Sequence, residues 1–335
     1  MEYTAEQLLE QAQKAIDSYE HGLAVKFMER AFELSPSSDI ANQIAISLLE
    51  LSNQSQNPEE IILNTRTWLE KAIELSPDTC WNSYLYLGQL SILEPAVLNY
   101  ETGVRILLNL IESTTDTELN DSYRRHVSTA LCSLTEIYMS DLCDQPEAES
   151  KCEEYMKLAL EKDIMNPEVY STLASVRLSQ CRMDEARECL KKNLELWYTE
   201  PKENDAIQVD PNWPNLNSRM TIAKLFMECA MYEESLVVLE TCQTENDQVV
   251  EISYLFGWCY LLISKNVEQE DEKNEFIQDA KECLDNVLKL QEKFDSMGEG
   301  FVPPEILCHT QELLRMIEDG QLELMDGVED EMDMS

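Results

Sequence analysis

Histidine, cysteine and carboxylate side chains are the groups in this sequence that could perform catalysis or bind a metal ion. The three histidines, His21, His126 and His309, lie far apart in the chain, whereas a nucleophile, a base and an orienting group must converge within hydrogen-bonding distance. The sequence contains no Gly-rich phosphate loop, H-E-x-x-H or G-x-S-x-G motif. Its eleven cysteines are scattered singly, without the C-x-x-C pairs of a zinc site. We therefore predict a protein that is not an enzyme and has no cofactor or metal ion.

Acidic residues dominate the charge, because 66 Asp and Glu stand against 25 Lys and Arg and give a formal net charge of -41. Nucleic-acid binding needs clustered Lys and Arg, so this balance argues against it. The same balance attracts basic proteins, and a groove lined with carboxylates focuses the attraction. Carboxylates pair with Lys and Arg, and aromatic rings stack on guanidinium groups. The chemistry that we predict is therefore recognition of a basic protein client.

The predicted client-binding residues are carboxylate, amide and aromatic side chains that recur at intervals suited to one face of successive helices. They are Glu6, Glu10, Asp17, Glu50, Asn82, Tyr86, Gln89, Glu136, Glu228, Glu251, Tyr254 and Trp258. Any one of them could instead be solvated or packed between helices, Tyr254 and Trp258 in particular. A second acidic group, Glu329, Asp330, Glu331 and Asp333, lies in a tail over 318–335 that we expect to be disordered. This tail would serve solubility or clasp a positive segment.

The elements that must position these residues are helical hairpins. A ten-residue phrase occurs twice, at 27–36 as FMERAFELSP and at 68–77 as WLEKAIELSP. A small residue where two antiparallel helices cross, bulky residues beside it and a terminating proline are typical of the second helix of a tetratricopeptide repeat. At about 34 residues per repeat, about seven hairpins follow. We predict an all-α, right-handed superhelical solenoid over 1–317, with the first helix of each hairpin on its concave side.

The longest interruption of this pattern, at 199–217, holds Pro201, Pro211 and Pro214 around Trp213. It is either a bend in the array or a packed, rigid loop. Prolines 303 and 304 then predict a last helix to about residue 317 that caps the final repeat.

Localisation is constrained by three sequence features. No stretch approaches the roughly 18 uninterrupted apolar residues of a membrane-spanning helix. The first residues are acidic where a secretory signal would be basic, and single cysteines on helical faces indicate reduced thiols. We expect a monomeric protein of the cytoplasm and nucleus without membrane or direct nucleic-acid partners.

Two segments and the overall charge carry a resemblance to a known family. The segments are 204–214, NDAIQVDPNWP, with the helix-like 219–234 that follows it, and 255–260, LFGWCY. With the acidic repeats and acidic end, they resemble fungal tetratricopeptide-repeat proteins that are dedicated assembly chaperones of large-subunit ribosomal protein four. The resemblance implies that the protein captures the newly made ribosomal protein, shields its long basic loop and accompanies it to pre-ribosome assembly in the nucleus. It assigns no individual binding residue.

Two other functions fit the same sequence. A general scaffold would join two proteins and use its acidic balance only for solubility, so that reversing charges in the groove would change little. A histone chaperone or transport adaptor would use the acidic groove for a different basic cargo. If the client is a ribosomal protein, the carboxylates act as substitute counter-charges for its Lys and Arg until RNA displaces them.

Overall fold

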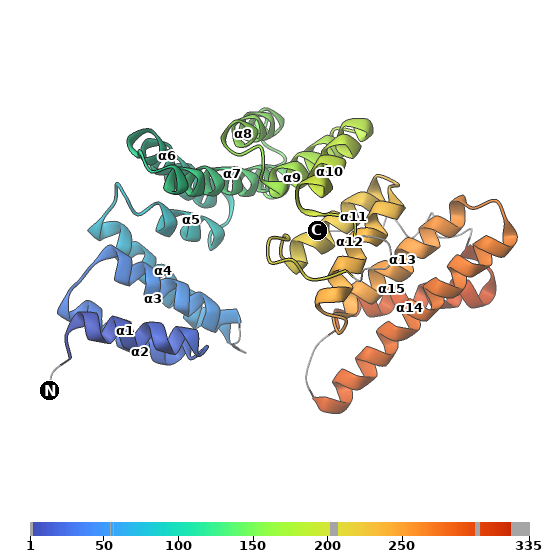
Figure 1. Cartoon of the computed structure of the whole chain (residues 1–335), viewed down its shortest axis with the longest axis horizontal. Helices are drawn as coiled ribbons and strands as arrows, with labels where there is room; N and C mark the ends of the chain where they lie inside the picture. The colour runs from blue at the N-terminus through green and yellow to red at the C-terminus, as the bar shows by residue number, and fades with distance from the viewer. Residues whose placement is uncertain (1–2, 54, 56, 202–206, 299–301, 323–335) are drawn as a thin grey trace. The chain divides into compact units, whose positions relative to one another are not determined.

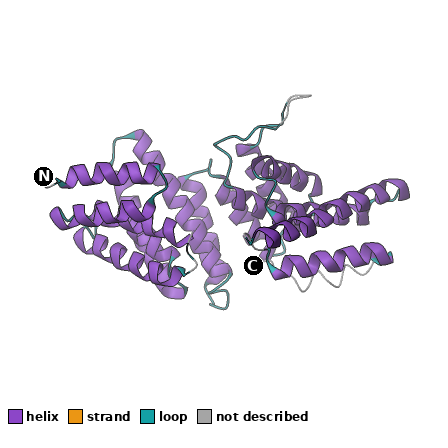
Figure 2. Cartoon of the chain, turned by 90° about the horizontal axis from the view of Figure 1, so that it is seen from below, coloured by secondary structure: helices purple, strands orange, loops and turns teal. Residues whose placement is uncertain are grey.

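The computed structural model describes residues 3–53, 55, 57–201, 207–298 and 302–322. Within these ranges the chain forms fifteen α-helices and no strand (Figures 1 and 2). The helices are α1 Ala5–Asp17, α2 His21–Leu34, α3 Ser38–Asn53, α4 Pro58–Leu75, α5 Trp81–Gln89, α6 Leu93–Ser113, α7 Thr117–Met139, α8 Ala148–Lys162, α9 Pro167–Ser179, α10 Met183–Trp197, α11 Leu216–Glu228, α12 Tyr232–Glu245, α13 Val250–Asn266, α14 Glu270–Met297 and α15 Pro304–Asp319. Six hairpins pack as consecutive pairs, α1 with α2, α3 with α4, α5 with α6, α7 with α8, α11 with α12 and α13 with α14, and the last helix packs on α13 and α14. This arrangement confirms the predicted all-α repeat fold.

The chain divides into two compact units, Met1–Thr172 and Leu173–Ser335, with the boundary inside α9. In both units most contacts run between consecutive helices, as in α1 with α2, α3 with α4 and α13 with α14. Each helix therefore buries its apolar face on its neighbours, and no single large core is needed. The predicted tail residues Glu329, Asp330, Glu331 and Asp333 lie outside the described residues.

The repeated sequence phrases form the second halves of α2 and α4, where small residues allow close helix packing. Ala24 and Ala31 in α2 and Ala72 in α4 are completely buried. Phe32 from the first phrase meets Trp68 from the second edge to face, with ring centroids 5.1 Å apart. Each helix stops just before its Ser-Pro pair, since proline cannot continue the backbone hydrogen bonding.

Three of the hairpin turns have the same backbone conformation, with a residue other than glycine at a positive φ angle. Tyr19, Cys181 and Ala230 have positive φ angles of 58°, 58° and 54°. In each turn the next backbone N–H donates to a carbonyl five residues earlier, over 2.8 Å, for example from Met231 to Phe226. This closes the first helix of the hairpin with a left-handed residue, a position that usually holds glycine.

The loop that interrupts the repeats is packed in its described part. The Trp213 ring lies edge to face with Trp197, centroids 6.1 Å apart, and 5.1 Å from the guanidinium carbon of Arg219. Arg219 is fully buried; its Nε donates to the Pro214 carbonyl and its Nη1 to Thr241 Oγ1, both over 2.9 Å. Its remaining nitrogen pairs with Glu245. Arg219 therefore fastens this loop to α11 and α12, whereas 202–206 lie outside the described residues.

Within the described ranges, no helix combines the length and apolar character that crossing a bilayer requires. All eleven cysteines are free of disulfide bonds, and six of them are buried. The six buried cysteines therefore behave as small apolar side chains of the helix interfaces.

Gly257 marks the closest crossing of α13 and α14. A Cβ atom there would lie 2.7 Å from Leu284 Cγ and 3.2 Å from the Ala280 carbonyl oxygen. Gly257→Ala is therefore expected to lower the free energy of unfolding by about 1–3 kcal/mol, because α14 must move away. Urea unfolding followed by circular dichroism measures the change.

The matched control for Gly257 is Gly22 in α2, whose added Cβ would have its nearest neighbour 4.0 Å away. Gly22→Ala should be neutral or stabilise by up to about 1 kcal/mol through helix propensity. Equal effects of the two substitutions would contradict the close crossing at Gly257.

A candidate cation-binding pocket in the N-terminal unit

A pocket of about 640 Å³ opens between α5 and α7 within the unit Met1–Thr172. Helix α5 contributes Asn82, Tyr86 and Gln89, and α7 contributes Glu136. These are four of the residues that we predicted to bind the client. Of the sixteen residues that line the pocket, all of them described, none is Lys or Arg.

Aromatic rings form much of the pocket wall. Trp81 and His126 lie with ring centroids 4.7 Å apart and planes tilted by 39°, and Tyr86 and Tyr100 complete the wall. Tyr100 reaches the pocket wall from α6 because Gly88 has no side chain. A Cβ atom at Gly88 would lie only 2.6 Å from the Tyr100 ring. Burial lowers the pKa of His126, so this residue offers a neutral ring at physiological pH rather than a positive charge.

Glu136 supplies the negative charge of the pocket. Its carboxylate has no hydrogen-bond or ion-pair partner among the residues that the structure describes. Loss of water raises the pKa of Glu136, and the neighbouring negative charge of Glu168 raises it further. Glu50 lies close to Tyr86. Burial raises the pKa of Tyr86, and the negative charge of Glu50 raises it further. The pocket thus holds carboxylate charge that no basic side chain of its own neutralises.

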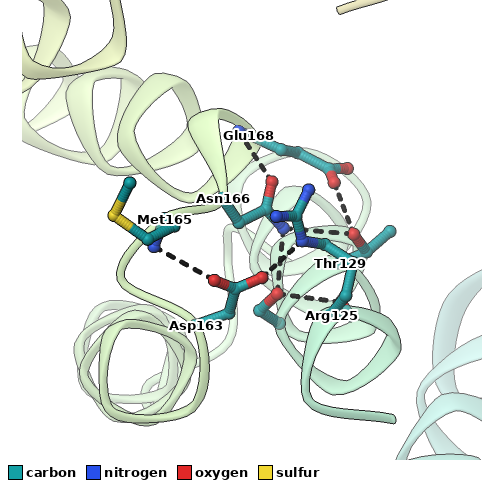
Figure 3. A network of polar contacts seen from close by, with 7 residues as sticks. Arg125, Thr129, Asp163, Met165, Asn166 and Glu168 are labelled. Carbon is teal, nitrogen blue, oxygen red and sulfur yellow. Dashed lines mark hydrogen bonds and ion pairs between the residues drawn. The ribbon is translucent and has the colours of Figure 1, made fainter. Parts of the chain in front are cut away.

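A polar network fixes Glu168 at the start of α9 (Figure 3). Thr129 Oγ1 donates to Glu168 Oε2 over 2.6 Å, and the backbone N–H of Glu168 donates to Asn166 Oδ1 over 3.1 Å. Asn166 in turn donates to Ser128 Oγ over 2.9 Å. Burial raises the pKa of Glu168, while its hydrogen bonds and Arg125 oppose this change.

Arg125, the basic residue of this network, forms its ion pair with Asp163 and not with Glu168. Its Nε pairs with Asp163, whose second oxygen accepts from the backbone N–H of Met165 over 3.0 Å (Figure 3). Arg125 is therefore held in an ion pair of its own, and it is not one of the residues that line the pocket.

The other predicted client-binding residues lie elsewhere. Glu6, Glu10 and Asp17 are exposed on α1 and do not line the pocket. In the second unit, Glu251 pairs with Lys224 over 2.8 Å, and burial raises the pKa of Glu228.

Tyr254 and Trp258 correct our expectation that they face an open groove. They are 4% and 7% exposed, and Tyr254 Oη is hydrogen-bonded to His309 Nδ1 over 2.7 Å. The Trp258 ring lies 4.9 Å from the His309 ring. Both side chains therefore hold α15 against α13.

Sequence reasoning missed Trp81, Tyr100, His126 and Glu168. One signal could have found part of the pocket, because the lining residues of α7 repeat every three or four positions. They are His126, Thr129, Ala130, Ser133, Glu136 and Ile137. Such spacing places side chains on one face of a helix.

The raised pKa of Glu136 predicts that this carboxylate costs stability at neutral pH. A folded-state pKa above the unfolded value means that the folded chain binds the proton more readily, so stability falls as pH rises through the folded-state pKa. Glu136→Gln should therefore raise the free energy of unfolding at pH 7 by a few tenths of a kcal/mol after solvent screening. The gain should vanish below about pH 4, where both states are protonated.

Urea unfolding at the two pH values tests this dependence. Glu70→Gln on α4, an exposed position away from the pocket, is the control and should show no such pH-dependent gain. A loss of stability for Glu136→Gln at pH 7 would show that the carboxylate is favourably held.

No family model matches the chain. Individual known proteins, however, are similar to it in sequence or in structure. A curated protein of Schizosaccharomyces pombe, named probable assembly chaperone of rpl4, is 31% identical over 329 residues, 95% of this chain and 91% of the relative. The solved structure of an assembly chaperone of RpL4, Acl4 residues 1–338, has a TM-score of 0.67 and 26% identity, and covers 79% of this chain and 98% of its own. A tetratricopeptide-repeat protein of Parabacteroides merdae, at 12% identity, shares the fold, with a TM-score of 0.51 over 94% of this chain and 98% of its own.

Proposed function

Since the chain belongs to the family of assembly chaperones of rpl4, we propose that it binds newly made rpl4 and shields the basic segments of this client. In this proposal the protein is a monomer that meets its client in the cytoplasm and accompanies it to the nucleus. No catalytic step is involved, and the acidic residues of 318–335 add to the negative charge that attracts a basic client.

The observation that carries the proposal is the pocket with carboxylate charge and with no Lys or Arg among its lining residues. Glu136 has no partner of its own, and Glu50 and Glu168 add negative charge close by. A ribosomal protein carries Lys and Arg that will later contact RNA phosphates. Carboxylates and aromatic rings can contact these cations in the meantime.

Release follows from the same electrostatics. Attraction between surface charges is screened over roughly 8 Å at physiological ionic strength, so the contacts with the chaperone weaken as salt rises. Ribosomal RNA presents a much denser array of negative charge than the pocket does. The client is therefore transferred when RNA competes for the same basic side chains.

A binding and competition experiment tests the proposed function. The purified protein is immobilised and offered rpl4, a core histone and egg-white lysozyme at equal concentration and about 150 mM salt. We expect retention of rpl4, little retention of the other two, and release of rpl4 on addition of ribosomal RNA. Equal retention of the histone would indicate a general chaperone of basic proteins. Retention of none of the three would overturn the shielding role.

A further inference from the structure

The pocket between α5 and α7 has an aromatic end and a carboxylate end, which lie at different levels of α7. We infer that the pocket binds an extended segment whose bulky apolar side chain and basic side chain are about four positions apart. The inference rests on the proposed function only for the origin of this segment, which would be rpl4. It adds to the attraction of opposite charges an anchor that depends on apolar contact.

The aromatic end lies where α5 begins. Trp81 is the first residue of α5 and Leu85 follows one turn later, and both are half-buried and line the pocket. The Trp81 ring centroid lies 4.7 Å from that of His126 on α7. Because burial lowers the pKa of His126, this ring carries no positive charge at physiological pH. The end therefore offers uncharged, largely apolar surface to a side chain that enters it.

The carboxylate end lies farther along α7. Glu136 follows His126 by ten residues on this helix, and both line the pocket. At a rise of 1.5 Å per residue, their levels differ by about 15 Å. Glu136 has no ion-pair or hydrogen-bond partner within the described part of the chain, and no lining residue is Lys or Arg. One bound side chain is too short to contact both ends, so two side chains of the same segment must occupy them.

The distance between the two ends sets the spacing of these side chains. An extended chain advances about 3.4 Å per residue, and side chains separated by an even number of positions point to the same face. Four positions therefore cover most of the 15 Å, and the flexible stem of Lys or Arg covers the rest. The pocket volume of about 640 Å³ lies within the range of about 300–1,000 Å³ that is usual for ligand sites.

The aromatic end distinguishes among basic clients. Carboxylates attract Lys and Arg of any protein, and salt screens this attraction. Burial of an apolar side chain against Trp81 and Leu85 is not screened by salt, since it depends on the area removed from water. A client with both groups at the right spacing is therefore held more tightly than one with basic residues alone.

Three fluorescein-labelled peptides of equal charge, built on Gly and Ser, test the inference by fluorescence anisotropy. The first has a central phenylalanine with an arginine four positions away on each side, the second has the arginines directly beside the phenylalanine, and the third is the first with serine in place of phenylalanine. We expect the first to bind about tenfold more tightly than the third and about fivefold more tightly than the second. The tenfold ratio should persist at about 500 mM salt.

Variants of the protein assign these preferences to the two ends. Trp81→Ser should reduce the ratio between the first and third peptides to about twofold or less, because the aromatic contact is lost. Glu136→Gln should bring the first and second peptides within about twofold of each other, because the spacing then has no carboxylate to meet. Glu70→Gln, at an exposed position of α4, should leave all three affinities unchanged.

His126→Ser, at an exposed position, is the second ring variant if Trp81→Ser lacks the helical circular dichroism of the intact protein, and should lower the tenfold ratio to about threefold. An unchanged ratio in a folded ring variant, or equal binding of the first and second peptides, would overturn the inference. Retention of rpl4 without a preference for phenylalanine would also overturn it and leave the proposed function standing. A spacing preference that depends on Trp81 and Glu136, in a protein that does not retain rpl4, would support the inference and overturn the function.

Discussion

Replacing Glu50 and Glu136 together by lysine should lower the affinity for rpl4 about 100-fold at physiological salt. The substitutions place two positive charges at the pocket that we propose as the binding site of client cations. Like charges across an interface are costly, and the cost is larger where the site is partly shielded from water. Surface plasmon resonance with immobilised rpl4 gives the dissociation constant. The difference from the intact protein should shrink as salt rises.

The control for this double variant is Glu70→Lys with Glu74→Lys, two exposed positions on α4. It changes the net charge by the same amount at a different place. We expect a reduction of about threefold or less, mostly in the association rate. If both double variants lost affinity equally, the total charge of the protein would govern binding and the pocket would have no special part.

Arg219→Met should lower the free energy of unfolding by about 3 kcal/mol. Methionine has a similar volume, so the change removes hydrogen bonds and charge more than packing. Thr241 and the Pro214 carbonyl lose their donors, and Glu245 loses its ion pair. The loop that carries Trp213 then loses its fastening to α11 and α12.

Urea unfolding measured by circular dichroism shows the effect of Arg219→Met. Arg30→Met serves as the control, because Arg30 pairs with Glu33 on an exposed face of α2 and should cost about 0.5 kcal/mol or less. A loss for Arg219→Met no larger than this would mean that the buried guanidinium is not needed to hold the loop.

The hairpin architecture was predictable because helix packing leaves a mark on the sequence. The two phrases at 27–36 and 68–77 contain the small, bulky and terminating residues that the crossing of two helices requires. The turns between helices have no comparable signal in the sequence. Tyr19, Cys181 and Ala230 adopt the left-handed conformation although their side chains disfavour it, so a search for glycine could not locate these turns.

The candidate site was predictable only where first helices remain uncovered. The expectation that first helices carry the binding residues placed Asn82, Tyr86 and Gln89 in the pocket. It failed at Tyr254 and Trp258 because α15 packs on α13 and brings His309 against both rings. The contact joins residues about 50 positions apart, for example Tyr254 and His309 at a separation of 55, and no local pattern encodes it.

The location of the pocket has a consequence for protein synthesis. Its lining residues and Glu168 all lie within Met1–Thr172, and the helices there contact their immediate neighbours. A chain made of such local contacts can fold progressively from its first helix as it leaves the ribosome. The pocket can therefore be complete while the remaining hairpins are still being translated, so that the order of synthesis is also the order in which binding capacity and the final cap are acquired.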